Sequence, residues 1–336
     1  MKRGKKILII ITTIIVIIII AFLLGPKPSA PVYSTALPAV PADFTGLTNY
    51  VKANEAKHKL KPDNEARIVW ANDSAKQKTD YVIVYIHGFS ACQEEGDPVH
   101  RAIAKAFGCN LYLARIAEHG IDTADQMVNV TADKYWESAK EALAIGKQLG
   151  KKVILMSTST GGTVSLKLAA TYPNEVEALI LMSPNIAINN DKAWLLNVHW
   201  GLQLARLITG SDFINNKTND KLKNQYWYSS YRLEAAVQLQ NLVETSMTKE
   251  TFEQVKQPTE LLYYYKDPVH QDSTVKVSAE LSMFDELGTP AALKCKQAIP
   301  DAGAHPIGSS IYSHDTKSVQ QAMESFMVKT LGMKEK

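Results

Sequence analysis

The stretch VILMSTSTGGTVSLKLAATY, residues 153–172, joins an apolar, strand-like run to a helix-like segment through a turn of Ser, Thr and Gly residues. A serine in such a sharp strand-to-helix turn is presented as a nucleophile, but the positions two before and two after it must be small. Around Ser159 those positions hold Ser157 and Gly161, whereas around Ser157 they hold Leu155 and Ser159. The stretch therefore predicts Ser159, rather than Ser157, as the candidate nucleophile.

Strand-like and helix-like segments alternate on both sides of this turn. The strand-like runs are apolar on both faces, as expected of strands covered by helices; they are residues 66–70, 81–86, 110–114, 152–156, 178–182, 260–265 and, more weakly, 293–298. The helix-like stretches are residues 98–107, 132–149, 161–172, 274–287 and 316–331. This alternation predicts an α/β fold with a mainly parallel sheet flanked by helices.

One long segment interrupts the alternation. Residues 185–257 contain no strand-like run, and stretches such as AWLLNVHWGLQLARLI (193–208) have apolar residues three and four apart. We expect a helical lid over the carboxyl ends of the strands, where open α/β sheets place their sites, between core segments 61–184 and 258–336. Ordinary packing helices are the alternative. The segment carries aromatic residues that suit an acyl-chain tunnel, a membrane contact or simply core: Trp194, Trp200, Tyr226, Trp227, Tyr228 and Tyr231.

The N-terminus has the pattern of a membrane-targeting segment. Lys2, Arg3, Lys5 and Lys6 precede a nearly unbroken apolar run over residues 7–24. As a helix of roughly 1.5 Å rise per residue, this run would cross most of a hydrocarbon core about 30 Å thick. We expect residues 1–25 to be a retained anchor with a cytoplasmic N-terminus and an extracytoplasmic domain; a cleaved secretory signal is the alternative. The prolines of residues 26–60 indicate an extended spacer.

Charge and cysteine content narrow the function classes. Four of the 37 basic residues precede the apolar run, so 33 remain against 34 acidic residues, and no basic face for nucleic acid is expected. Cys92 and Cys109 could pair in an oxidising compartment, leaving Cys295 alone, or all three could be small buried residues. The chain shows no Cys-x-x-Cys or clustered histidine pattern, and we expect no metal or other cofactor.

The turn at Ser159 resembles the nucleophile elbow of the α/β-hydrolase superfamily, usually Gly-x-Ser-x-Gly. The resemblance covers most of the chain from about residue 60. It includes the segment His87-Gly88-Phe89, which directly follows an apolar strand. It implies an α/β-hydrolase fold with an oxyanion hole formed by the backbone N–H groups of Phe89 and Thr160. Serine in place of the first glycine departs from the pattern and weakens the motif.

The same resemblance implies a base and an acid later in the chain, in the order Ser, Asp or Glu, His. His305 lies in a loop of small residues that resembles the loop of the catalytic base; His314, beside an Asp before the last helix, is the alternative. Asp272, in Asp-Ser-Thr-Val, resembles the acid position after the strand 260–265, with Asp267 as the alternative.

The sequence thus resembles carboxylesterases and monoacylglycerol-lipase-like serine hydrolases. The resemblance implies cleavage of carboxylic esters through an acyl-enzyme intermediate, by a triad of Ser159, Asp272 and His305. Membrane anchoring makes lipid-derived acyl esters plausible substrates. Two alternatives remain open: a non-catalytic protein that binds a ligand or partner on the same scaffold, and an acyltransferase with the same triad.

Overall fold

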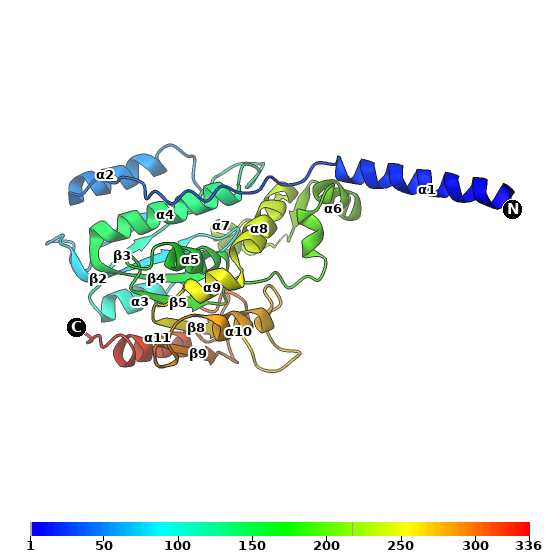
Figure 1. The fold of residues 1–336 in the computed structure, drawn as a ribbon. Helices are drawn as coiled ribbons and strands as arrows, with labels where there is room; N and C mark the ends of the chain where they lie inside the picture. Colours follow the sequence, from blue (N-terminus) through cyan, green and yellow to red (C-terminus); the bar gives the residue numbers. More distant parts are fainter. Residues whose placement is uncertain (1, 217) are drawn as a thin grey trace.

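A seven-stranded sheet forms the centre of the computed structural model, which describes residues 2–216 and 218–336 (Figure 1). The strands lie in the order β1-β3-β2-β4-β5-β8-β9. Their bounds are β1 (Arg67–Val69), β2 (Thr79–Ile86), β3 (Asn110–Leu113), β4 (Gly150–Thr158), β5 (Ala178–Met182), β8 (Thr259–Tyr263) and β9 (Lys294–Ala298). Only β1 runs antiparallel to its neighbour among these seven strands, so the predicted mainly parallel sheet is confirmed.

Helices cover both faces of the sheet, and the side chains of each strand alternate between them. On β2, Val84 packs with the cluster that contains the helices α4 (Ala132–Leu149) and α5 (Thr160–Thr171). Its neighbour Tyr85 belongs to the cluster on the other face, with α3 (Val99–Ala106) and α11 (Thr316–Lys329). Two buried faces explain why the central strands β4 and β5 are apolar at nearly every buried position, whereas the edge strand β9 is largely exposed and polar. The carboxyl ends of the parallel strands therefore lie on the same side of the domain, together with the loops that follow β2, β4 and β8.

The segment between β5 and β8 is mostly helical but contains a small second sheet. Its elements are η2 (Ala193–Asn197), α6 (Gly201–Thr209), β6 (Phe213–Asn215), α7 (Lys221–Tyr226), β7 (Ser230–Arg232), α8 (Leu233–Ser246) and α9 (Lys249–Gln254). The antiparallel pair of β6 and β7 corrects the expectation that residues 185–257 contain no strand. Strands of three residues are too short to produce a periodic pattern in sequence.

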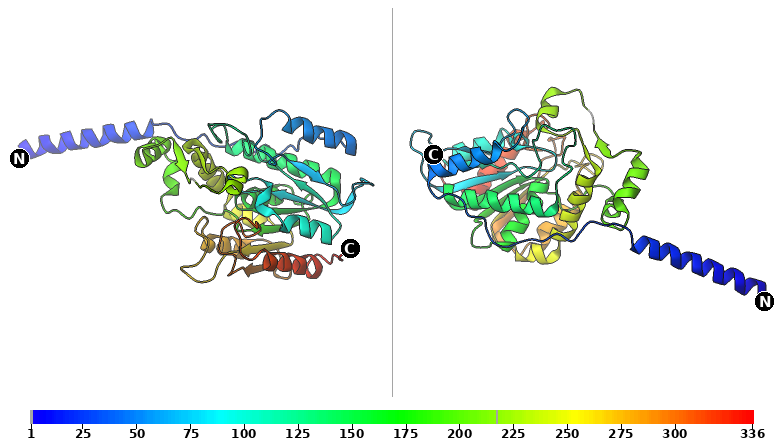
Figure 2. Two further views of the ribbon diagram at one scale, coloured as in Figure 1. Left: turned by 180° about the vertical axis from the view of Figure 1, so that it is seen from behind. Right: turned by 90° about the horizontal axis from the view of Figure 1, so that it is seen from above.

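The N-terminal helix α1 (Lys2–Leu23) projects away from the remainder of the chain in both views of Figure 2. Residues 3–23 of this helix are long and apolar enough to cross a membrane, and its apolar side chains are exposed. Two roles fit these properties equally well, a membrane span and a signal sequence.

The region predicted as an extended spacer lies against the domain and includes a helix. Residues 26–41 are extended, but α2 (Phe44–Glu55) follows, with Asp43 accepting a hydrogen bond from Gly46 N–H at its start. Buried Leu47 and Val51 attach α2 to the domain, and the indole of Trp136 in α4 donates to the carbonyl oxygen of Ser34. Half-buried Phe44 and Tyr50 add apolar contacts three residues on either side of Leu47, so α2 has a short amphipathic pattern within the residues expected to form the spacer.

All three cysteines are free. Cys92 follows the carboxyl end of β2, whereas Cys109 precedes the amino end of β3. Because β2 and β3 are parallel neighbours, the two thiols lie at opposite ends of these strands. The Cys92–Cys109 disulfide considered from the sequence is therefore wrong. The alternative of three buried residues is also incorrect for Cys295, which is exposed.

Candidate active site

Ser159 occupies a strained backbone position between β4 and α5. Its φ of 54° and ψ of −121° lie in a region that costs a residue with a side chain about 1–3 kcal/mol. Three hydrogen bonds hold the position: Ser159 N–H donates to Met182 O, and Ser159 O accepts from Gly162 N–H and Asn185 N–H. Ser157, in contrast, lies inside β4 and is fully buried. Of the two serines, Ser159 alone lines the pocket described below.

The turn is packed so closely that small residues are required around it. A Cβ atom added at Gly161 would lie 2.0 Å from the carbonyl oxygen of Ile86. A Cβ atom added at Gly88 would lie 2.8 Å from Cβ of Ser159. The loop after β2 therefore touches the turn after β4, and both glycines permit this approach.

His305 and Asp272 come together on the loops after β9 and β8. The distance from His305 Nδ1 to Asp272 Oδ2 is 2.5 Å, and Asp272 Oδ1 accepts from the N–H groups of Thr274 and Val275. Burial acts to raise the pKa of Asp272, but the charge and hydrogen bond of His305, together with the N–H groups of Thr274 and Val275, lower the pKa below its ordinary value. The acid is therefore ionised and oriented toward the imidazole.

The two alternatives from the sequence lie elsewhere. Asp267 is exposed and holds His270 in a local turn, at 2.9 Å from Asp267 Oδ2 to His270 Nδ1. His314 packs beside Gly303 and is absent from the described residues that line the pocket. The geometry thus brings Asp272 rather than Asp267 to His305, and brings His305 rather than His314 to Ser159.

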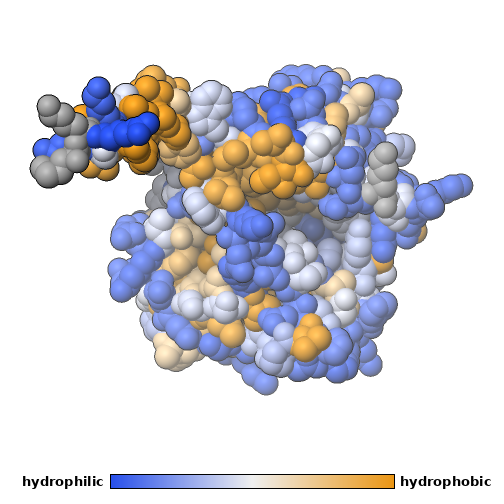
Figure 3. Space-filling view, turned by 90° about the vertical axis from the view of Figure 1, so that its right-hand side faces the viewer, coloured by the Kyte–Doolittle hydropathy of each residue, from blue (hydrophilic) through white to orange (hydrophobic). Residues whose placement is uncertain are grey.

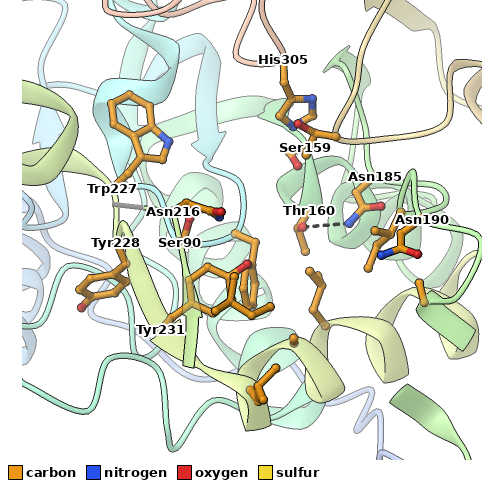
Figure 4. A pocket seen from close by; sticks show the side chains of 18 of the residues that line it. Ser90, Ser159, Thr160, Asn185, Asn190, Asn216, Trp227, Tyr228, Tyr231 and His305 are labelled. Atoms are coloured by element: carbon orange, nitrogen blue, oxygen red, sulfur yellow. Dashed lines mark hydrogen bonds between the residues drawn. The ribbon is translucent and has the colours of Figure 1, made fainter. Parts of the chain in front are cut away.

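His305 lines the pocket, and the Nε2 atom of its ring faces away from Asp272. Nε2 of His305 is buried and has no hydrogen-bond partner among the described residues. Figure 4 shows the His305 ring and the Ser159 side chain next to one another on the pocket wall. Burial of the imidazole acts to lower its pKa, but Asp272 and, more weakly, Glu95 raise the pKa of His305 above its ordinary value.

Two backbone N–H groups beside Ser159 are free to bind an anion. Thr160 is the first residue of α5, so its N–H has no acceptor within the helix. Phe89 N–H likewise has no partner among the described residues. The N-terminus of α5 also carries a partial positive charge. Phe89 and Thr160 are the two residues whose N–H groups the resemblance assigned to an oxyanion hole.

A cavity of about 710 Å³ opens beside Ser159. Its wall is largely apolar and comes mainly from the segment between β5 and β8; examples are Leu195, Leu196, Leu204, Ile214, Tyr231 and Leu233. Of the six aromatic residues singled out in that segment, Trp227, Tyr228 and Tyr231 line the cavity. Sites for small apolar ligands have this size and character.

Glu95 is a buried carboxyl group beside the turn that the sequence did not reveal. Its Oε2 accepts a hydrogen bond of 2.5 Å from Gly88 N–H, next to Phe89, and the residue lines the cavity. Burial raises the pKa of Glu95 to about 7, although the Gly88 hydrogen bond and the charge of His305 oppose this. Glu94 and Glu95 look alike in sequence, and only the short helix η1 (Gln93–Gly96) directs one of them inward.

Replacing Glu95 should change the pH dependence of any reaction that uses His305 as a base. In Glu95→Gln the amide can still accept from Gly88 N–H, but the negative charge that raises the pKa of His305 is lost. The imidazole then stays neutral to lower pH, so the acid limb of kcat/KM against pH should move to lower pH. In Glu95→Ala the loop also loses its hydrogen bond, and kcat/KM should fall by about 10- to 100-fold.

The matched control is Glu94→Gln, which removes a neighbouring half-buried carboxyl whose side chain does not line the cavity. Its pH profile should superimpose on that of the parent. An acid limb that stays in place in Glu95→Gln would show that Glu95 supports the loop without acting on His305.

Comparison with known proteins gives a consistent result. The sequence signature described as serine aminopeptidase, S33, matches residues 77–280, which is more than half of the chain. Among solved structures, one of the metagenome-derived lipolytic enzymes LipS and LipT has a TM-score of 0.64 at 14% identity, covering 81% of this chain and 100% of that chain. The monoacylglycerol lipase of Paleococcus ferrophilus has a TM-score of 0.58 at 15% identity, covering 78% and 97%.

A soluble variant of the Saccharomyces cerevisiae monoglyceride lipase, in complex with a substrate analogue, has a TM-score of 0.58 at 14% identity, covering 79% of this chain and 91% of that chain. No curated protein matches the sequence. At such identities the likeness to these structures is one of fold.

Proposed function

The chain belongs to the serine aminopeptidase S33 family of α/β hydrolases, and on this premise we propose that it is a serine hydrolase that cleaves carboxylic esters. The membership confirms the α/β-hydrolase fold expected from the sequence. The observation that carries the proposal is the placement of a strained, pocket-lining serine beside an imidazole whose other nitrogen contacts a buried carboxylate.

The proposed reaction begins when Ser159 Oγ attacks the carbonyl carbon of the ester and His305 Nε2 accepts its proton. The negative charge that forms on the carbonyl oxygen is stabilised by the N–H groups of Phe89 and Thr160. Asp272 holds the imidazole in the tautomer that carries its proton on Nδ1 and stabilises its cation. His305 then protonates the departing alcohol, and water attacks the acyl-enzyme in a second cycle of the same steps.

The apolar wall of the cavity supports substrates with an acyl chain. Burying one methylene group contributes about 0.8 kcal/mol to the free energy of binding, so affinity should increase with acyl-chain length until the cavity is filled. The structural relatives include lipolytic enzymes and monoglyceride lipases. We therefore propose lipid-derived acyl esters as the substrate class, with the segment 185–257 as a lid and with α1 anchoring an extracytoplasmic domain to a membrane.

A series of esters tests this proposal. We expect kcat/KM to rise from two to about eight acyl carbons, by up to about fourfold for each buried methylene group. The same preparation should react with a fluorophosphonate probe, with the label on the peptide that contains Ser159. A flat dependence on acyl length would contradict the lipid-ester assignment.

The alternatives give different outcomes in the same assay. A non-catalytic binding protein would bind the esters saturably without taking up the probe. An acyltransferase would release acyl product at a rate that depends on an added alcohol acceptor, because the acceptor competes with water for the acyl-enzyme.

A further inference from the structure

The end of the membrane-type helix α1 is attached to the start of α6. Trp200, the residue before α6, makes two hydrogen bonds to this part of the chain. Its indole Nε1 donates to the carbonyl oxygen of Ala21 at 3.1 Å, and its backbone N–H donates to the carbonyl oxygen of Pro26 at 2.7 Å. His199 Nδ1 donates to the carbonyl oxygen of Gly25 at 2.7 Å. These three hydrogen bonds connect the last turn of α1 and the residues just after it with one short stretch of the segment between β5 and β8.

The attachment is closely fitted. Gly25 is buried, and a Cβ atom added there would lie 1.9 Å from Trp200 Nε1, so the contact needs glycine. Trp200 itself has a φ of 64°, the left-handed region that few residues with a side chain adopt. The rings of Phe22 and His199 lie 5.7 Å apart. Such a contact fixes the position of α6 relative to the end of α1.

Beside this contact, large apolar side chains project into solvent. Leu207 and Ile208 at the end of α6 are 81% and 73% exposed, and Trp194 in η2 is 55% exposed. Figure 3 views the molecule from the side on which α1 projects, and it shows an apolar patch on this face next to a hollow. Of these three exposed residues, Ile208 also lines the cavity, so the end of α6 borders the cavity.

We propose that Trp194, Trp200, Leu207 and Ile208, called here the α6 apolar surface, rest on the lipid bilayer that α1 crosses. Residues 3–23 form a helix about 32 Å long, which matches the hydrocarbon core, so Gly25 lies at its boundary with water. The hydrogen bonds of Trp200 then place the start of α6 at that boundary, where tryptophan is favoured. The same bilayer that holds α1 thus covers these side chains.

This arrangement directs the opening of the cavity at the membrane surface. An amphiphilic ester could then pass from the lipid into the cavity along the exposed side of α6 without crossing water. This second step rests on the proposed ester hydrolysis, whereas the contact between the α6 apolar surface and lipid rests only on the proposed anchoring of the domain by α1.

Fluorescence quenching tests the contact without using catalysis. The full chain, with Cys295→Ser to remove the exposed thiol, receives Leu207→Cys, is labelled with an environment-sensitive fluorophore and is reconstituted into phosphatidylcholine vesicles. Cys92 and Cys109 are buried and should not react. Val328→Cys is the matched control, because Val328 is 43% exposed on α11, on the opposite side of the domain from α1 in Figure 1.

Spin-labelled lipid should quench the probe at position 207 at least about twofold more than the probe at position 328, and aqueous iodide should do the reverse. Equal responses at the two positions would overturn the proposal. Self-quenching at position 207 that grows with protein density, without lipid quenching, would instead show a contact with a second copy of this chain, and would overturn it as well.

A paired activity assay tests the consequence. Trp194 and Leu207 do not belong to the described residues that line the cavity, so the double variant Trp194→Gln/Leu207→Gln leaves the cavity intact. Hydrolysis of a water-soluble short ester should stay within about twofold of the parent, whereas hydrolysis of monoacylglycerol in vesicles should fall by about 10-fold. Val328→Gln should change neither rate.

The outcomes separate the two proposals. If the parent cleaves neither ester, the proposed function fails while the quenching result still stands. If the double variant cleaves vesicle-bound monoacylglycerol as fast as the parent, entry of substrate along the α6 apolar surface is wrong.

Discussion

Ser159→Ala should lower kcat/KM for ester hydrolysis by about 10⁴- to 10⁶-fold, because it removes the atom that forms the acyl-enzyme. The remaining Phe89 and Thr160 N–H groups would still polarise a bound carbonyl, so a small residual rate over water is expected. The backbone strain at position 159 is independent of the hydroxyl, and alanine tolerates the same φ and ψ no worse than serine. The variant should therefore fold normally, as thermal unfolding would show, while its activity is lost.

Two other serines provide the controls for this experiment. Ser157 is buried in β4, and Ser90 lines the cavity on the loop after Phe89. Ser157→Ala and Ser90→Ala should each retain fluorophosphonate labelling, while Ser159→Ala should lose it. Full labelling of Ser159→Ala would move the nucleophile to one of the other two serines, and peptide mapping by mass spectrometry would identify which.

The sheet was predictable because its central strands β2 to β5 are buried on both faces. A run such as residues 81–86 has no polar side, so it can lie only between two helix layers, and the intervening amphipathic helices supply those layers. Other elements escaped prediction for different reasons. β6 and β7 have three residues each, too few to produce a periodic pattern. α2 carries Phe44, Leu47 and Val51 at helical spacing, but it directly follows the proline-containing stretch that was expected to be an extended spacer.

The site was predictable where a local backbone shape constrains the sequence. Gly161 is required by the carbonyl oxygen of Ile86, so the turn around Ser159 leaves a trace of small residues. Glu95 leaves no such trace, because its role depends on which way a short helix turns and on the approach of the loop that carries His305. Asp267 and Asp272 both follow β8, and the local Asp-Ser-Thr-Val pattern favoured Asp272, but only the approach of the loop after β9 shows which carboxylate His305 contacts.

The choice between those two carboxylates gives the second large prediction. Asp272→Asn should lower kcat/KM by about 10⁴-fold, because an amide that faces His305 Nδ1 favours the wrong tautomer and cannot stabilise the imidazolium cation. The loss should fall mainly on kcat, since Asp272 does not line the cavity among the described residues and should affect substrate binding little. Stopped-flow assays with a chromogenic ester would measure the rate of acylation directly.

The pH dependence separates this loss of charge from a general loss of structure. Asp272 raises the pKa of His305, so in Asp272→Asn the pKa of the imidazole should fall and the acid limb of the residual activity should move to lower pH. Asp267→Asn is the matched control: it removes an exposed carboxylate that contacts only its own turn, and it should leave both the rate and the pH profile unchanged. If Asp267→Asn abolished activity while Asp272→Asn retained it, the assignment of Asp272 would be wrong, and Asp267 would have to reach His305 from the other end of the loop. Such a rearrangement would have to break the hydrogen bonds that Thr274 and Val275 donate to Asp272.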